Sequence, residues 1–366
     1  MIYFLINNNF HLIDIQKHIK ELSNQSIGLI KIPHTLTIES NYSFDREFEF
    51  PPLIRRLKDH FSFLKIFKLH QNIKKSLRDI TSSDILIFYT EYEYLNHYVI
   101  RLFKKKHAKV ILIEEGFPTY ISFASTPDSQ LSFKKKGLNF FLQYILGYSK
   151  TKIVSVNHLP KTQIEDNQID KLLLYTDIKI KRKVKTGLLS TQNIEFNNLN
   201  ENTILFLNEA LYGHYMPMEE YLLIIDDIFK NLSLYFETIF FKFHPREDEE
   251  SKKIIRIVLN KYPNVKIINE NKPVELMIEE IDAKYVTSFL SQTILYLSNS
   301  NCISFYIFNL YPALMEHPEF ITVKKIIDEM NYKFMNDWST VKNGNQGFFK
   351  SKSNHTNTLK FYLEQI

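Results

Sequence analysis

The sequence predicts an α/β protein built from two doubly wound, Rossmann-like domains. Its 366 residues are enough for two domains of ordinary size, and 44% of them are apolar, which excludes a disordered chain and a single small binding module. Short apolar runs alternate with longer segments of helical periodicity, as expected for parallel strands joined by crossover helices. The alternation breaks between residues 178 and 202, which marks the boundary between two halves.

Apolar runs bounded by polar residues predict the strands of both halves. In the first half these are Ile2–Ile6, Ser26–Ile32, Asp84–Tyr89, Val110–Ile113 and Lys152–Val156. In the second half they are Thr203–Leu207, Thr238–Phe243, Val265–Ile268, Tyr285–Val286 and Cys302–Ile307. Segments between them predict the helices Leu12–Leu22, Leu53–Thr81, Tyr94–Lys105, Pro217–Leu232, Glu249–Lys261 and Pro273–Ile281. We therefore expect one doubly wound domain over residues 1–190 and a second over residues 191–366.

Composition narrows the class of protein further. Lys and Arg number 46 against 41 acidic residues, a mild excess that argues against a dedicated nucleic-acid binder. The single cysteine, Cys302, excludes a disulfide framework and a thiolate zinc site and fits a reducing compartment. Only 8 glycines occur, so glycine-rich phosphate loops are scarce.

The chain ends and basic clusters bear on localisation. Met1–Phe10 has no basic flank and no small-residue cleavage site, so it is predicted to be a first strand, and no apolar run reaches 18 residues. We expect a cytoplasmic protein. Three basic clusters, Lys104–Lys106, Lys134–Lys136 and Lys179–Lys185, fit either solvated loops and helix ends or a peripheral contact with the inner, anionic surface of a membrane.

The first candidate site follows the strand Val110–Ile113. Glu114-Glu115-Gly116 places at least one carboxylate at the carboxyl end of that strand, and Gly116 permits a tight turn there. A carboxylate at such a strand end is a candidate general base, whereas the alternative is an ordinary acidic turn.

The second candidate site ends the strand Thr238–Phe243. Lys242 and His244 are two residues apart, so they lie on the same side of the strand, and Pro245 stops the ladder. The pair forms a cationic spot suited to a phosphate, and the alternative is a half-buried structural histidine.

Two further segments could contact the same ligand. Thr287-Ser288 follows a short strand and precedes a helical stretch, so its hydroxyls and backbone N–H groups could bind an anion or only cap the helix. Glu275 follows Pro273 in a first helical turn, where it could accept a hydrogen bond from a nucleotide base or ribose or only favour the helix start.

In combination, these four segments resemble the motif set of bacterial GT-B sialyltransferases, which include the lipooligosaccharide sialyltransferases and the capsular polysialyltransferases. Those families share an acidic-acidic-Gly motif in the N-terminal domain, an HP motif in the C-terminal domain and a later Ser/Thr pair. The order is the same here. Glu-Glu replaces the common Asp-containing motif, Thr-Ser replaces Ser-Ser, and Phe243 replaces a small residue before the histidine, so linkage and acceptor stay open.

The resemblance implies a GT-B-type α/β fold whose two domains face a central cleft, with the acceptor bound by residues 1–190 and the CMP-sugar by residues 191–366. It implies inverting, metal-independent transfer of sialic acid from CMP-sialic acid to a sugar hydroxyl of a bacterial surface glycan, such as lipooligosaccharide or capsule, with no further cofactor. The aromatic content leaves a homodimer open.

The resemblance also implies roles for individual residues. Glu114 or Glu115 would be the general base and His244 the general acid, while Lys242, Thr287 and Ser288 would bind the phosphate and Glu275 the cytidine. Three other carboxylates, Glu209, Glu219 and Glu220, stay open as the base. Two alternative functions also stay open: another GT-B transferase using CMP-Kdo or a CDP-linked donor, and a non-catalytic nucleotide-binding subunit of a capsule complex.

Overall fold

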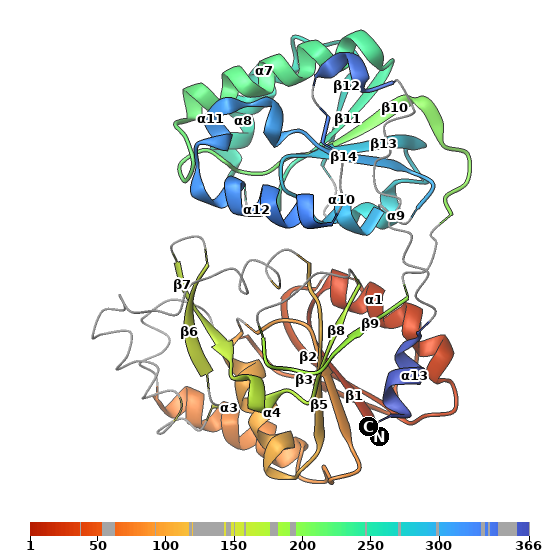
Figure 1. Ribbon diagram of the computed structural model, residues 1–366, viewed down its shortest axis with the longest axis vertical. Helices are drawn as coiled ribbons and strands as arrows, with labels where there is room; N and C mark the ends of the chain where they lie inside the picture. The colour runs from red at the N-terminus through yellow and green to blue at the C-terminus, as the bar shows by residue number, and fades with distance from the viewer. Residues whose placement is uncertain are drawn as a thin grey trace. The chain divides into compact units, whose positions relative to one another are not determined.

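The computed structural model describes most of the chain, in two compact units (Figure 1). The described residues are 1–36, 38–52, 63–91, 93–116, 119, 143, 148–149, 151–156, 159–175, 182–190, 195–245, 247–269, 272–297, 300–330, 334–335, 337–342 and 357–365. Unit 1 comprises Met1–Ser190 and Asn354–Ile366, and unit 2 comprises Thr191–Ser353.

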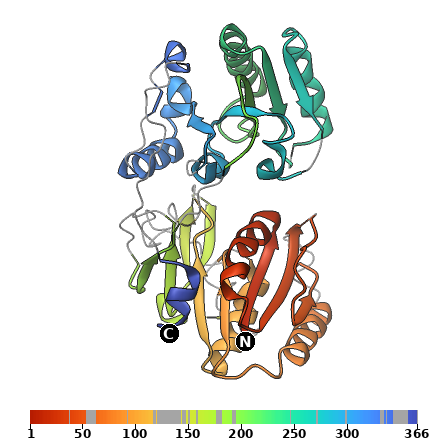
Figure 2. The same ribbon diagram turned by 90° about the vertical axis from the view of Figure 1, so that its right-hand side faces the viewer.

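Unit 1 is built on a seven-stranded parallel sheet in the order β3-β2-β1-β4-β5-β8-β9. Its strands are β1 (Ile2–Asn8), β2 (Ile27–Thr35), β3 (Arg46–Glu49), β4 (Ile85–Phe88), β5 (Lys109–Ile113), β8 (Lys171–Leu174) and β9 (Thr186–Leu188). Its helices are α1 (Asn9–Ile19), α3 (Phe63–Ser76), α4 (Tyr94–Lys105) and α13 (Leu359–Leu363), with short 3₁₀ turns at Lys20–Leu22 and Asp166–Gln168. Helices α1 and α13 cover one face of the sheet, and α3 and α4 lie on the other (Figures 1 and 2).

Unit 2 repeats this architecture with a five-stranded parallel sheet in the order β12-β11-β10-β13-β14. Its strands are β10 (Asn200–Leu207), β11 (Thr238–Lys242), β12 (Val265–Ile268), β13 (Ala283–Ser288) and β14 (Ile303–Tyr306). Its helices are α7 (Met218–Tyr235), α8 (Glu249–Leu259), α9 (Val274–Met277), α10 (Gln292–Leu297), α11 (Pro312–Met315) and α12 (Pro318–Glu329), with 3₁₀ turns at Phe308–Leu310 and Trp338–Thr340. Helices α7 and α8 lie on one face and α9, α10 and α12 on the other (Figure 1).

The predicted α/β class with two doubly wound, GT-B-type units is confirmed by the topology of both sheets. In each sheet the chain first builds strands outward on one side and then returns to build on the other. The change of direction falls between β1 and β4 in unit 1 and between β10 and β13 in unit 2. Open α/β sheets bind ligands at the carboxyl ends of the strands at such a switch point.

Local sequence explains why the helices begin and end where they do. Helix α8 starts at Asp248, whose side chain accepts a hydrogen bond from the Ser251 N–H, with Glu249 and Glu250 in the first turn. Helix α4 buries Leu95, Val99, Ile100 and Phe103 along one face and places Lys104 and Lys105 at its C-terminus. Tyr94–Lys105 is the range expected for this helix from the sequence.

Three expectations about the first half of the chain were wrong or incomplete, and a fourth falls partly on residues that the structure does not describe. The strand expected at Lys152–Val156 exists as β6 (Thr151–Val156), but it pairs antiparallel with β7 (Leu159–Ile164) in a separate two-stranded sheet. Strands β3, β8 and β9 were not expected, because each has only three or four residues. Strand β9 lies within the segment assigned to the linker. Of the helix expected over Leu53–Thr81, residues 53–62 lie outside the described part of the chain.

The C-terminal segment corrects the domain assignment. Residues from Asn354 onward were expected in the second domain but belong to unit 1. Leu359 and Tyr362 of α13 are buried in the core that β1, β4 and α1 form. The Tyr362 hydroxyl accepts a hydrogen bond from the Leu188 N–H at 2.9 Å and donates to the Leu188 carbonyl at 2.8 Å, so it closes the free edge of β9.

No helix in the described part of the chain is long and apolar enough to cross a membrane.

Candidate active site

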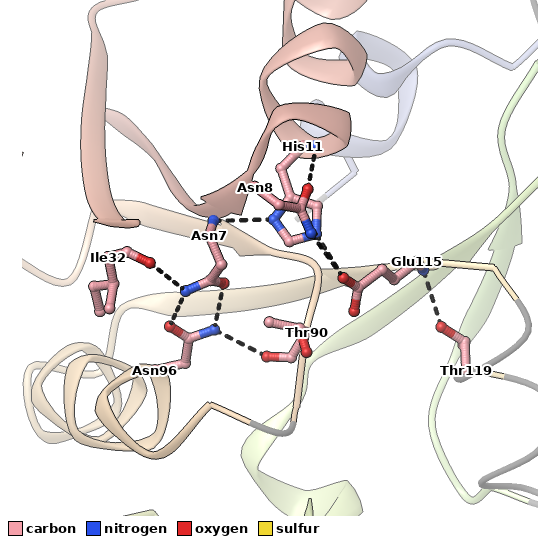
Figure 3. Close-up of polar contacts among 8 residues, drawn as sticks. All are labelled: Asn7, Asn8, His11, Ile32, Thr90, Asn96, Glu115 and Thr119. Atoms are coloured by element: carbon pink, nitrogen blue, oxygen red, sulfur yellow. Dashed lines mark hydrogen bonds and ion pairs between the residues drawn. The ribbon is translucent and has the colours of Figure 1, made fainter. Parts of the chain in front are cut away.

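Polar side chains gather at the switch point of unit 1. Asn7 and Asn8 end β1, Thr90 follows β4, and Glu114 and Glu115 follow β5. Because neighbouring parallel strands end at one edge of the sheet, residues more than 80 positions apart in the sequence come together there (Figure 3).

Glu115 is the centre of this cluster. Its Oε1 accepts from Asn8 Nδ2 at 3.2 Å and lies 3.0 Å from His11 Nε2 on α1. The Glu115 N–H donates to the Thr119 hydroxyl at 2.9 Å, and Gly116 takes a φ of 97°, a left-handed conformation that favours glycine. Asn8 and His11 therefore hold the Glu115 carboxylate, and Thr119 holds the backbone of the tight turn that follows it.

Hydrogen bonding decides the charge state of Glu115. Burial alone raises its pKa, but the contact with the His11 ring and the hydrogen bonds that the carboxylate accepts outweigh burial, so the pKa is lowered overall. Glu115 is consequently ionised at neutral pH and can accept a proton.

The two predicted carboxylates have different environments. The Glu114 side chain is buried, and its Oε2 accepts a hydrogen bond from the Tyr175 N–H at 2.7 Å, which caps the end of β8. The Glu115 side chain is 17% exposed at the edge of the sheet. Glu115 is therefore the better candidate for contact with a substrate, and Glu114 for a structural role.

Paired asparagines brace this edge. The Asn96 amide on α4 donates to Asn7 Oδ1 at 2.9 Å and accepts from Asn7 Nδ2 at 3.2 Å. The same two amides also donate to the carbonyls of Thr90 and Ile32, at 3.0 and 3.1 Å. All of these groups are buried, so the network fixes the ends of β1 and β4 against α4.

In unit 2 the HP segment lies at the carboxyl end of β11, beside the switch point. Lys242 is the last residue of β11 and pairs in register with Leu207 of β10, which also pairs with Ser288 of β13. His244 follows two residues later and is partly exposed. The unit therefore brings His244 to the edge where a doubly wound sheet binds its ligand.

A buried carboxylate holds the backbone at His244. Glu247 Oε1 accepts from the His244 N–H at 2.7 Å and from Asn208 Nδ2 at 2.9 Å, while its Oε2 accepts from the Tyr212 hydroxyl at 3.3 Å. Burial raises the pKa of Glu247 despite these donors. Glu247 thus joins the ends of β10 and β11 around the HP turn.

The hydroxyl pair and Lys242 are less accessible than expected. Thr287 and Ser288 are the last residues of β13 and are fully buried, and α10 begins only at Gln292. The Thr287 hydroxyl donates to the Phe305 carbonyl at 3.0 Å, and Ser288 Oγ accepts from the Ser291 N–H at 3.2 Å. The contacts of this pair thus agree with the capping alternative, and its role in binding an anion stays a prediction. Lys242 is also buried.

The remaining sequence candidates lie on other elements of unit 2. Glu275 is in α9 with Pro273 as its N-cap, but the placement of the Glu275 side chain lies outside what the structure describes. Glu209 accepts a hydrogen bond from the Leu290 N–H at 2.6 Å, which ties β10 to the segment before α10. Glu219 and Glu220 are in the first turn of α7, where acids favour a helix.

Some residues of the basic clusters form ion pairs within unit 1. Arg182, within the stretch Lys179–Lys185, is buried and donates to both oxygens of Glu91 at 2.8 Å and to Asp166 at 2.7 Å. Lys104 pairs with Asp170 at 2.9 Å. Lys134–Lys136 lie outside the described residues.

Sequence reasoning missed Asn7, Asn8, His11, Asn96 and Glu247. For the first two a signal was present, because the run Asn7-Asn8-Asn9 directly follows the apolar run Ile2–Ile6, like the polar residues after the other strands. Glu247 stands three residues after the HP histidine, the spacing at which a carboxylate can reach back to a backbone N–H. Within the described residues, no group of three or more His, Cys, Asp or Glu side chains is arranged to hold a metal ion.

Comparison with known families decides the classification. A family model described as alpha-2,8-polysialyltransferase (POLYST) matches residues 3–307, a range that includes every predicted site residue of both units. The chain belongs to the alpha-2,8-polysialyltransferase family. The resemblance to bacterial sialyltransferases is thereby confirmed, and this polysialyltransferase-family chain is a glycosyltransferase. No curated protein matches it by sequence.

Solved structures with a similar fold have little sequence in common with this polysialyltransferase-family chain. They include MurG of Acinetobacter baumannii, with 10% identity over 93% of this chain and 86% of that chain and a TM-score of 0.44. A putative UDP-N-acetylglucosamine 2-epimerase of Listeria monocytogenes has 8% identity over 91% and 90%, with a TM-score of 0.48. MnaA of S. aureus with UDP has 10% identity over 90% of each chain and a TM-score of 0.47. Similarities at this level support no statement about activity.

Proposed function

We propose that this protein is an inverting, metal-independent sialyltransferase that moves sialic acid from CMP-sialic acid to a sugar hydroxyl of a bacterial surface glycan, in capsule or lipooligosaccharide. The observation that carries the proposal is the polysialyltransferase family match, which spans the Glu-Glu-Gly segment of unit 1 and the HP segment of unit 2. We further propose that the enzyme works in the cytoplasm, with at most a peripheral contact with the membrane.

Glu115 is the general base of this proposal. It takes the proton of the acceptor hydroxyl while the acceptor oxygen forms a bond to the anomeric carbon of sialic acid. The bond from that carbon to the phosphate oxygen breaks in the same displacement, and CMP leaves with the electron pair, so the anomeric configuration inverts. Its partly exposed side chain supports this choice over the buried Glu114.

His244 stabilises the departing CMP phosphate as a proton or hydrogen-bond donor. Its support is its place at the carboxyl end of β11 and the Glu247 carboxylate that fixes its backbone. Because CMP leaves as a monophosphate, one protein cation and backbone donors can stabilise the charge, and the reaction is proposed to need no metal clamp or other cofactor.

Transfer assays test this function. The purified chain is given CMP-sialic acid and a fluorescent sialylated oligosaccharide, with and without EDTA, and the product is analysed by mass and by its anomeric configuration. We expect chain extension that EDTA does not abolish and an α-linked product. Turnover of CMP-Kdo or a CDP-linked sugar in place of CMP-sialic acid would overturn the donor assignment.

Two pairs of variants test the residues. Glu115→Gln and His244→Ala are each expected to lower kcat by about 100-fold or more, the usual worth of a general acid or base. Glu114→Gln and His214→Ala are their matched controls, since Glu114 caps β8 and His214 is exposed on the loop after β10. Equal losses in a variant and its control would remove the catalytic role.

A further inference from the structure

The side chain of His11 has no catalytic assignment, yet it is in contact with the proposed base. His11 lies in the first turn of α1 and is fully buried. Its ring stacks on Tyr89 at a centroid distance of 4.6 Å and an interplanar angle of 11°. Stacking and burial leave the ring one orientation, with Nε2 toward Glu115 at 3.0 Å.

A backbone hydrogen bond fixes which nitrogen of His11 carries the proton. The Asn7 N–H lies 3.1 Å from Nδ1 and can only donate. Nδ1 is therefore the acceptor, and the neutral ring carries its proton on Nε2, where it donates to Glu115 Oε1.

Asn8 is oriented by the same helix start. Its Oδ1 accepts from the His11 N–H at 3.0 Å as the N-cap of α1, which leaves Nδ2 to donate to Glu115 Oε1. One carboxylate oxygen of Glu115 thus receives two donors from neighbouring residues, one at the N-cap and one in the first turn of α1 (Figure 3).

We propose that His11 is a positioning residue that holds the Glu115 carboxylate oriented for removal of the acceptor proton. The inference rests on the proposed function, because it requires Glu115 to be the base. It goes beyond that function by assigning the geometry of the base to the N-terminus of α1, outside the Glu-Glu-Gly segment.

Other titratable groups surround the pair and bear on its pH dependence. Tyr89, directly after β4, packs on His11. Tyr175 follows β8 and donates a hydrogen bond to Asp14 of α1. Asp14 also contacts His18 and Lys17. Glu114 lies beside Tyr175, and burial raises the pKa of both tyrosines while hydrogen bonds and nearby positive charges lower that of Asp14. The tyrosines thus stay neutral and Asp14 stays ionised around neutral pH, so an acid limb of kcat/KM below the ordinary pKa of a glutamate reports Glu115.

Two substitutions separate positioning from simple packing. His11→Gln places an amide N–H where Nε2–H lies but loses the acceptor for Asn7. His11→Asn keeps an acceptor near Nδ1 but cannot reach Glu115. The control His18→Ala removes another buried histidine of α1, whose Nε2 lies 3.0 Å from the Tyr175 hydroxyl and which does not contact Glu115.

Each variant is assayed for kcat, for the KM of CMP-sialic acid, for the pH dependence of kcat/KM and for thermal unfolding. We expect His11→Asn to lower kcat by about 10- to 100-fold, the usual cost of misplacing a reacting group, with little change in donor KM. The acid limb of kcat/KM for His11→Asn should move to higher pH, because Glu115 loses a hydrogen-bond donor that lowers its pKa. His11→Gln should keep most of kcat and the wild-type limb.

The outcomes separate the inference from the proposed function. A folded His11→Asn with wild-type kcat and acid limb, or a His11→Gln as impaired as His11→Asn, overturns the positioning role. If Glu115→Gln retains activity, Glu115 is not the base, and the proposed mechanism fails together with this inference. If Glu115→Gln is inactive while both His11 variants behave as wild type, the proposed function survives and only the inference fails.

Discussion

The contact between Gly187 and Tyr362 allows a quantitative test of how α13 closes unit 1. A Cβ added to Gly187 would lie 2.6 Å from Cε1 and 2.8 Å from Cζ of the Tyr362 ring. Real Cβ contacts are not that short, so Gly187→Ala must displace the ring. Displacement also separates the Tyr362 hydroxyl from both backbone groups of Leu188.

The expected cost follows from these two effects. Overpacking costs about 1–3 kcal/mol, and the loss of the hydrogen bonds to the partly buried Leu188 backbone adds about 1 kcal/mol. We therefore expect Gly187→Ala to lower the free energy of unfolding by about 2–4 kcal/mol. In a Tyr362→Ala background the ring is absent, so the same substitution should cost less than about 1 kcal/mol, a coupling of about 1–3 kcal/mol.

Urea unfolding of the full chain, followed by far-ultraviolet circular dichroism, measures all four members of this cycle. The midpoint should fall for Gly187→Ala and for Tyr362→Ala separately, and the double variant should resemble Tyr362→Ala. If Gly187→Ala costs the same in both backgrounds, the ring of Tyr362 does not pack over Gly187, and α13 does not close β9 in the way described.

Three further predictions concern buried groups. Arg182→Ala should lower the free energy of unfolding by about 3–5 kcal/mol, because it removes the ion pairs to the buried Glu91 and the partly exposed Asp166, while Ala at the exposed Lys183 should change it little in the same urea assay. Thr287→Val should cost about 1 kcal/mol for the lost bond to Phe305 and leave kcat and donor KM unchanged, and a large rise in donor KM would restore Thr287 as a phosphate ligand. Burial raises the pKa of Cys302 to about 11, so at pH 8 its thiol should resist a thiol reagent until urea unfolds the chain, and fast labelling of the native protein would contradict this.

The fold was predictable wherever an element is long or a strand is buried on both faces. Strand β1 and helix α4 have strong, regular apolar patterns; α4 has the expected range, and β1 extends the expected Ile2–Ile6 to Asn8. Strands β3 and β9 were not predictable, because a short strand at a sheet edge carries few apolar residues and depends on its partners. The packing of α13 on unit 1 depends on contacts between residues more than 170 positions apart.

The candidate site was predictable in location but not in the roles of its members. Polar residues after apolar strands correctly indicated the edges that hold Glu115 and His244. The difference between Glu114 and Glu115 depends on Tyr175, a residue of another strand that no local pattern points to. The burial of Thr287 could not be predicted, because hydroxyl residues that end a buried strand have the same sequence pattern as hydroxyl residues that cap the helix after a strand.

The return of the chain to unit 1 has a consequence for biosynthesis. Unit 2 is continuous in sequence, whereas unit 1 is assembled from residues on both sides of it. A ribosome therefore completes unit 2 before α13 emerges, and until then the core around Leu359 and Tyr362 lacks its cover and the edge of β9 is unprotected. The first unit to be started is the last that can finish folding.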